Sequence, residues 1–197
     1  MPEWSKPLVA AALLFVGIFG ALSGRPIERA PGVLVDHEPV QHETQTRAFM
    51  HGAFELTPLA TYDIEARVLS VERYRIEGGA KLSPVDFAVG WGPMSDSAVL
   101  GHFRVTQGAR FFTIYPDENA LDLSAALLSS ANMHLIPASA AIRDRLDDAR
   151  PGNIVHLRGL LVNASGPNHY TWQTSLSRSD TGAGACELFF VEEAAIR

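Results

Sequence analysis

The stretch IVHLRGLLV, residues 154–162, is the clearest β-strand signal in this chain. It consists mostly of leucine and β-branched residues, a composition that is typical of a strand packed into a core. Gly159 interrupts the run, and a glycine inside a strand indicates a bulge or the bend of a barrel. The stretch therefore predicts a strand that curves.

Further strand signals lie on both sides of this stretch. Residues 62–70 alternate between apolar and polar side chains, which indicates a strand with one buried face. Residues 109–115 (ARFFTIY) are aromatic and β-branched, and a turn is expected at Gln107-Gly108. Two shorter strands are expected at residues 170–177 (YTWQTSLS) and 188–191, which close the chain.

Helical signals are short and lie between these strands. Residues 83–86 (SPVD) combine a Ser cap with Pro at the first helical position, which predicts a two-turn helix. Residues 121–133 are rich in Ala and Leu and are expected to be partly helical. Another helix is expected after Pro137, where Ile142 and Leu146 share one face.

The order of these elements predicts one β-rich α+β domain over residues 54–197. We expect a small curved antiparallel sheet or an OB-like, partly open barrel with short helical insertions. Residues 24–53 hold repeated Pro and Gly and a polar stretch, without a strand or helix period, so they are predicted to be an extended linker. Residues 33–35 (VLV) are the part of this linker that could dock on the domain as a short strand.

The first 23 residues contain an uncharged apolar run, PLVAAALLFVGIFGAL, at residues 7–22. Its length is at the short end of the roughly 17–25 residues that span a bilayer as a helix. Residues 1–23 are therefore predicted to be a transmembrane helix acting as a signal-anchor, with a cleaved signal peptide as the alternative. The short N-terminal tail favours a single-pass inner-membrane protein whose globular domain is periplasmic.

The charge balance limits the class of partner. The chain has 16 basic and 22 acidic residues, a formal net charge of −6. An acidic domain has no general attraction for nucleic acid phosphates or for anionic lipid, so no nucleic acid partner is expected. Cys186 is the single cysteine, so the chain cannot form an intramolecular disulfide.

Three segments place small or turn-forming residues next to a reactive or recognising side chain: GWGPMSD (90–96), SANMHLIPA (130–138) and DTGAGACE (180–187). Such segments are expected to be loops that carry a site on a rigid β scaffold. Taken together, they resemble a family of uncharacterised bacterial membrane-anchored envelope proteins, with a likeness that covers about residues 54–193. The resemblance implies an envelope setting and a single domain, and it brings no activity with it.

Two candidate sites follow from these segments. For catalysis, Cys186 would be the thiolate nucleophile and His134 its base, oriented by Asn132, Asp96 or Asp180. The competing interpretation is that Cys186 is a small buried residue at the start of the last strand, and that His134 satisfies nearby loop carbonyls.

For ligand binding, one concave surface would bring together five residues, namely Trp91, Met94, Asp96, His134 and Asp180. Trp91, Tyr170 and Trp172 could stack on a sugar or a base, or could instead fill the barrel core. No metal site and no cofactor are expected, because the His-Glu pairs at residues 37–38 and 42–43 match no compact metal motif.

The leading functional hypothesis is a membrane-tethered, non-catalytic binding or assembly module of the bacterial cell envelope, with an envelope protein as its possible partner. The reason is the absence of any specific catalytic spacing beside an anchor and a tether. The alternative is an envelope hydrolase or transferase that uses Cys186 with His134. A weaker alternative is an OB-like nucleic-acid-binding or nuclease domain, which the acidic charge argues against.

Overall fold

The computed structural model describes residues 25–177 and 186–197. The predicted anchor at residues 1–23 lies outside them, as does Asp180. Among the described residues, the helices are all too short or too polar to cross a bilayer.

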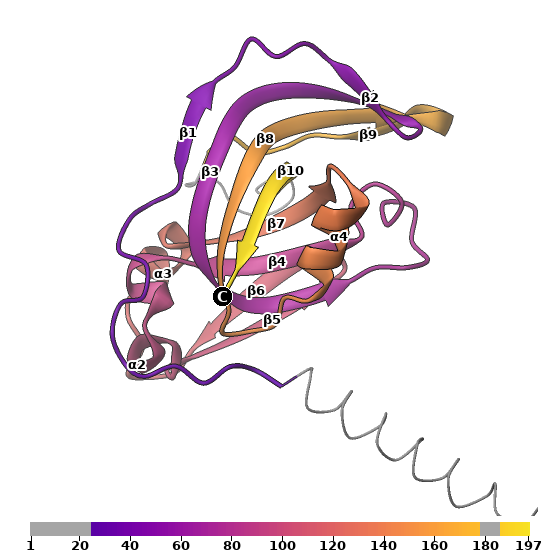
Figure 1. Ribbon diagram of the computed structural model, residues 1–197. Coiled ribbons are helices and arrows are strands. Elements are labelled where there is room, and N and C mark those ends of the chain that lie inside the picture. Colours follow the sequence, from indigo (N-terminus) through magenta and orange to yellow (C-terminus); the bar gives the residue numbers. More distant parts are fainter. Residues whose placement is uncertain (1–24, 178–185) are drawn as a thin grey trace, which may run out of the picture.

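The described part of the chain is a β-rich domain built on a curled eight-stranded sheet (Figure 1). Its strands are β1 (Val40–Glu43), β2 (Phe49–His51), β3 (Phe54–Arg73), β4 (Val85–Gly90), β7 (Ser130–Pro137), β8 (Ile154–Gly166), β9 (Tyr170–Trp172) and β10 (Glu187–Ile196). A separate hairpin consists of β5 (Phe103–Gly108) and β6 (Phe111–Pro116). The helices are α2 (Ser97–Leu100), α3 (Leu123–Leu128) and α4 (Ala140–Asp147), with 3-10 turns η1 (Gly92–Ser95) and η2 (Pro167–His169).

Five of these strands close into a ring. Because β3 pairs with β4 on one side and with β8 on the other, the path β3-β4-β7-β10-β8 returns to β3. All of these pairings are antiparallel except the one between β7 and β10, which is parallel. The prediction of a curved β-rich domain is therefore confirmed, and the prediction that its sheet is antiparallel is wrong for this one pair.

The core fills the inside of the ring. Along β3, Tyr62, Ile64, Ala66 and Val68 are all buried, as the period-two pattern predicted. Leu146 of α4 packs against the same core, and the helix lies beside the β7–β10 part of the ring (Figure 1). The helix expected after Pro137 is thus confirmed.

Gly159 lies where two strands come closest together. A Cβ at this position would be 2.0 Å from the Phe190 carbonyl oxygen, which any side chain would displace. The register between β8 and β10 shifts opposite this glycine, between Val191 and Glu193. The predicted irregularity exists, and the extra residue is in the partner strand β10.

Two segments predicted to be helix or loop are buried central strands. Residues 83–86 lead into β4, and residues 130–137 form β7; every residue of both strands is buried. A strand that is covered on both faces has no reason to alternate between polar and apolar residues. The helix prediction at Ser83 followed a local cap signal, which pairing with β3 and β7 overrides.

The segment predicted to be an extended linker is partly folded onto the barrel. Strands β1 and β2 both pair with β3, and Val35 is only 2% exposed. Val35 docks through a backbone bond from Gly92 to its carbonyl rather than as a strand. Strand β1 was not predicted because its side chains are mostly exposed and show no hydrophobic period in the sequence. It is held in place by backbone pairing, which no sequence pattern records.

The hairpin turn is displaced by two residues from its predicted place. The loop residues are Ala109 and Arg110, with φ values of 50° and 71°, and not Gln107-Gly108. A two-residue hairpin loop with positive φ at both positions matches the twist of the flanking strands. Its consequence is that Arg110 stands at the hairpin tip.

Candidate functional site

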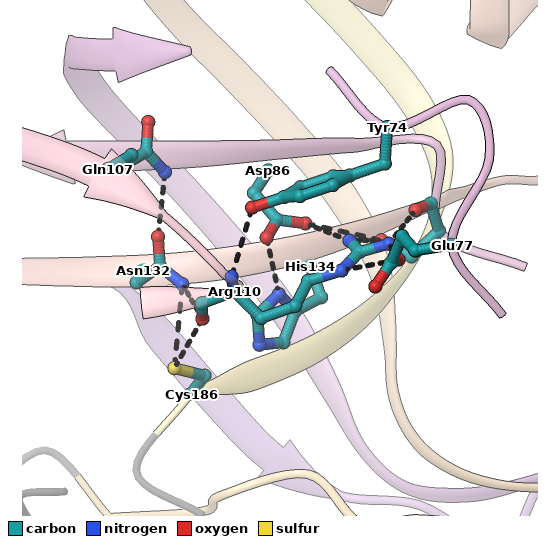
Figure 2. A network of polar contacts seen from close by, with 9 residues as sticks. Tyr74, Glu77, Asp86, Gln107, Arg110, Asn132, His134 and Cys186 are labelled. Atoms are coloured by element: carbon teal, nitrogen blue, oxygen red, sulfur yellow. Dashed lines mark hydrogen bonds and ion pairs between the residues drawn. The ribbon is translucent and has the colours of Figure 1, made fainter. Parts of the chain in front are cut away.

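A buried polar cluster lies on the outer face of β4 and β7. Asp86 of β4 is directly opposite His134 of β7 in the register, and Asn132 lies two residues earlier on the same face. The alternate residues of β7, Met133 and Leu135, point into the barrel core. We define the polar cluster as Ser83, Asp86, Arg110, Asn132 and His134, and Figure 2 labels the last four of these residues.

Asp86 is the centre of this polar cluster. His134 Nδ1 lies 2.9 Å from Asp86 Oδ2, a close polar contact without the alignment of a hydrogen bond. Arg110 Nη1 donates to Asp86 Oδ1 at 2.6 Å. The carboxylate side chain is 1% exposed, so it depends on these partners in place of water.

The guanidinium of Arg110 has all of its donors engaged by the protein. Nε and Nη2 donate to Glu77 Oε1, Nη2 also donates to the Ser83 carbonyl, and Nη1 donates to Asp86 and to Ser83 Oγ. A guanidinium has five N–H donors, which match these five contacts. Arg110 therefore ties the hairpin tip to β4 and to the loop at residues 74–84.

Two aromatic rings flank Arg110. Its guanidinium carbon lies 3.6 Å from the centroid of the Tyr74 ring and 5.2 Å from that of Trp172. The Tyr74 hydroxyl also accepts a hydrogen bond from the Arg110 backbone N–H at 3.0 Å. Burial raises the pKa of Tyr74 to about 12.

Asn132 connects the polar cluster to Cys186. Its Nδ2 donates to the Arg110 carbonyl at 3.0 Å and lies 3.5 Å from Cys186 Sγ, while its Oδ1 accepts from Gln107 Nε2 at 2.7 Å. The thiol also points to the Arg110 carbonyl at 3.9 Å. Neither an amide nor a carbonyl takes a proton from a thiol, so these two contacts do not activate Cys186 as a nucleophile.

A cleft of about 360 Å³ opens above the polar cluster. Its volume lies within the range of small-molecule sites, roughly 300–1,000 Å³. Loop 74–84, the hairpin tip, β7, the segment around β9 and the residue directly before β10 supply its described lining: Glu77, Gly79, Arg110, Phe111, His134, Tyr170, Thr171, Trp172, Gln173 and Cys186.

Aromatic side chains dominate the walls of the cleft. The Trp172 ring lies against His134, with centroids 4.6 Å apart, and Tyr170 meets Trp172 edge-on at 6.4 Å. Phe111 is 48% exposed. Burial raises the pKa of Tyr170, which favours its neutral hydroxyl, a hydrogen-bond donor and acceptor. The rings are held in place and still present apolar faces to the cleft.

The structure brings together some of the predicted site residues and separates others. His134, Asn132 and Cys186 meet at the polar cluster and the cleft wall. Trp91 and Met94 are instead buried, at 2% and 0% exposure. They belong to two core clusters and do not line the cleft.

Asp96 has a structural role away from the cleft. Its Oδ1 accepts from the Ala98 N–H, which caps α2, and from the Gly32 N–H, both at 2.8 Å. These hydrogen bonds, chiefly the one from Gly32, lower the pKa of Asp96. Ser95 in the same segment binds the backbone of Leu34 and Val35. The segment GWGPMSD therefore holds residues 32–35 against the barrel.

Sequence reasoning missed Glu77, Asp86 and Arg110 as members of a site. No motif surrounds any of the three in the sequence, and they converge only through the pairing of β4 and the fold of the hairpin. The one local signal was an acidic residue, Asp86, inside a strand that is otherwise apolar. Among the described residues, no group of three His, Cys, Asp or Glu side chains is placed to hold a metal ion.

No protein-family model, curated protein or solved structure gives a significant match to this chain. The fold and the site therefore define the class of protein directly. It is a β-rich domain on a curled sheet, with an aromatic-lined cleft above a buried polar cluster.

Proposed function

We propose that this chain is a membrane-tethered, non-catalytic binding module of the bacterial envelope, and that its ligand occupies the aromatic-lined cleft. The observation that carries the proposal is the pairing of Trp172 and Tyr170 in a cleft whose floor contains Arg110, which Glu77, Asp86 and Ser83 hold in place. Rigid rings over a fixed floor form a preorganised receptor, because little ordering is needed when a ligand binds.

The strand order supports an OB-like barrel as the scaffold. The ring contains β3, β4 and β7 in sequence, then α4, then β8, and the last strand β10 lies between β7 and β8. OB-like barrels bind ligands on the face of their second and third strands, between the loops that follow the first and fourth. Here those strands are β4 and β7, and the cleft lies between loop 74–84 and the segment after β8.

The contacts of the reactive groups support binding rather than chemistry. His134 Nδ1 faces the Asp86 carboxylate, and the thiol of Cys186 faces an amide and a carbonyl. A catalytic pair needs its base within about 2.6–3.2 Å of the atom whose proton it removes. Neither the Asn132 amide nor the Arg110 carbonyl, which the thiol contacts, can act as such a base.

The membrane tether rests on the apolar run at residues 7–22. We expect the full chain to stay with membranes through an alkaline carbonate wash, and a chain that starts at residue 25 to be released. Release of the full chain by the wash would contradict the tether and leave the binding site untouched.

Binding is tested with the purified full chain in detergent. Thermal unfolding and tryptophan fluorescence are followed with ligands of four classes: neutral oligosaccharides, oligonucleotides, short peptides and quaternary amines. We expect at least one class to raise the melting temperature, and Trp172→Ala to abolish that rise. Tyr115→Ala is the matched control, since Tyr115 is an exposed aromatic residue outside the cleft.

The outcome separates binding from catalysis. A bound ligand recovered unchanged after prolonged incubation supports the binding module. If the protein converts the ligand and Cys186→Ala does not, the chain is a thiol enzyme instead. This second function is retained because Cys186 lies on the cleft wall. If no ligand class raises the melting temperature in a way that Trp172→Ala abolishes, the proposed site is wrong.

A further inference from the structure

We infer that the cleft takes a neutral, hydroxyl-rich glycan rather than a ligand that carries phosphate or carboxylate groups. The inference rests on the proposed binding function and adds the chemical class of the ligand. Three features of the described lining support this inference. The donors of its one guanidinium are already engaged, its rim carries hydrogen-bonding groups, and its aromatic rings have apolar faces.

The guanidinium of Arg110 is not available to an anion. Arg110 is the only Lys or Arg among the described residues that line the cleft. Its donors go to Glu77, Asp86 and Ser83, and two of these partners are carboxylates. Phosphate recognition normally uses free donors of a guanidinium fork or of several cations. A phosphate entering this cleft would have to displace a carboxylate that already neutralises the charge.

The rim of the cleft supplies groups that suit hydroxyls. Both contacts from Arg110 to Glu77 end on Oε1, so within the described residues the other carboxylate oxygen can accept from a ligand. The Glu77 side chain is 43% exposed. Thr171 and Gln173 line the cleft as exposed neutral donors and acceptors. A sugar hydroxyl can both donate and accept, so it can use all three groups.

The aromatic rings suit a ligand with an apolar face. A pyranose ring has faces of C–H groups and a rim of hydroxyls, so it can pack on Tyr170 or Trp172 while its edge reaches the polar rim. Phe111 adds a half-exposed ring to the lining. A nucleobase also stacks on aromatic rings, but the phosphates beside it find no unpaired cation in the described lining.

The binding experiment uses neutral trisaccharides, oligothymidylate and choline as probes, titrated by isothermal calorimetry into the purified full chain in detergent. We expect a neutral trisaccharide (chitotriose, cellotriose or maltotriose) to bind with an affinity that changes little with salt. Oligothymidylate and choline are expected not to bind. Weak salt dependence distinguishes hydroxyl recognition from ion pairing, because screening acts only on charge.

Variants locate the sugar. We expect Trp172→Phe and Tyr170→Ala each to weaken trisaccharide binding about tenfold, and Tyr115→Ala to leave it unchanged. Glu77→Gln is expected to weaken it several-fold through loss of an anionic acceptor, whereas Glu118→Gln, at an exposed position outside the cleft, leaves it unchanged. Tyr170→Phe, which keeps the ring, separates stacking from loss of fold, together with circular dichroism of every variant.

The inference and the proposed function can fail separately. Binding of oligothymidylate or choline that depends on Trp172, without trisaccharide binding, would overturn the glycan inference and leave the binding module standing. Trisaccharide binding that is the same in Trp172→Phe, Tyr170→Ala and wild type would also overturn it, because the sugar would then lie outside the cleft.

Discussion

At the residue scale, Arg110 joins parts of the chain that are distant in sequence. It lies at a hairpin tip in a left-handed conformation that costs a non-glycine residue about 1–2 kcal/mol. The contacts with Asp86, Glu77 and Ser83 offset this cost and hold the tip over β4. The backbone strain at Arg110 is thus associated with the polar cluster and the cleft.

Arg110→Lys is expected to lower the free energy of unfolding by about 1–3 kcal/mol. Lysine keeps the charge but cannot form the planar fork that reaches Asp86, Glu77 and Ser83 together. Urea denaturation followed by circular dichroism measures the change. Arg104→Lys is the matched control, because Arg104 is exposed on the same hairpin and its guanidinium lies over the Tyr115 ring. We expect this variant to stay within about 0.5 kcal/mol of wild type. Equal losses in the two variants would contradict the role given to Arg110.

The raised pKa of Tyr74 predicts that the stability of the folded protein falls at high pH. Its pKa is raised by burial from 10.0 to about 12, so the folded state favours the neutral phenol. Its contribution to stability is therefore present below about pH 10 and is lost as the pH rises towards 12, because the unfolded chain releases the proton first. Ultraviolet titration of phenolate should show a step near 12 that Tyr74→Phe removes. In urea, where the chain is unfolded, the step should move to the ordinary tyrosine pKa of about 10. A folded protein that shows no step near 12 would contradict the prediction.

At the element scale, the central strands β4 and β7 explain both the fold and the site. One face of each strand contributes to the barrel core, and the opposite face carries Asp86, Asn132 and His134. Because both faces are covered, the local sequence resembles neither an alternating strand nor an amphipathic helix. Polar residues on such a strand are retained only where partners satisfy them, and the hairpin and the cleft wall supply those partners here.

A substitution at Gly159 tests whether the close approach of β8 and β10 is needed to close the barrel. Gly159→Ala is expected to lower the free energy of unfolding by at least about 2 kcal/mol, because its Cβ would overlap the Phe190 carbonyl and push β8 and β10 apart. Gly108→Ala in β5 is the matched control, since no atom lies within 4 Å of its added Cβ. The midpoints of urea denaturation give the comparison. Wild-type stability in Gly159→Ala would show that the two strands can separate without cost.

At the scale of the whole molecule, the segment before β3 is part of the folded domain. The Ile27 N–H and Arg29 Nε bind carbonyls at residues 151–152, and Val35 is buried beside the segment GWGPMSD. Strands β1 and β2 then pair with the first half of β3 (Figure 1). The prediction of an extended linker over residues 24–53 is therefore wrong for the parts of this segment that are bound to the domain.

A chain that starts at Phe54 should be less stable than one that starts at Arg25. We expect its melting temperature to be lower by about 5 °C or more, since it loses the buried Val35 side chain and the pairing of two strands with β3. Differential scanning calorimetry of the two chains makes the comparison. Identical melting temperatures would mean that residues 25–53 act only as a linker.

The sequence by itself determined the β-rich class, the inward face of β3, the helix after Pro137 and the irregularity near Gly159. Each of these depends on a local signal: an alternating pattern, a cap or a glycine in an apolar run. The choice of His134, Asn132 and Cys186 as neighbours also came from sequence, although as members of loops.

The tertiary structure alone decided the rest. The parallel pairing of β7 with β10, the docking of Val35 and the meeting of Asp86 with Arg110 are contacts between residues far apart in the chain. Such contacts depend on which strands become neighbours when the ring closes, and no local period records that choice. The aromatic-lined cleft belongs to this second group, because its described walls come from five separate stretches of the chain.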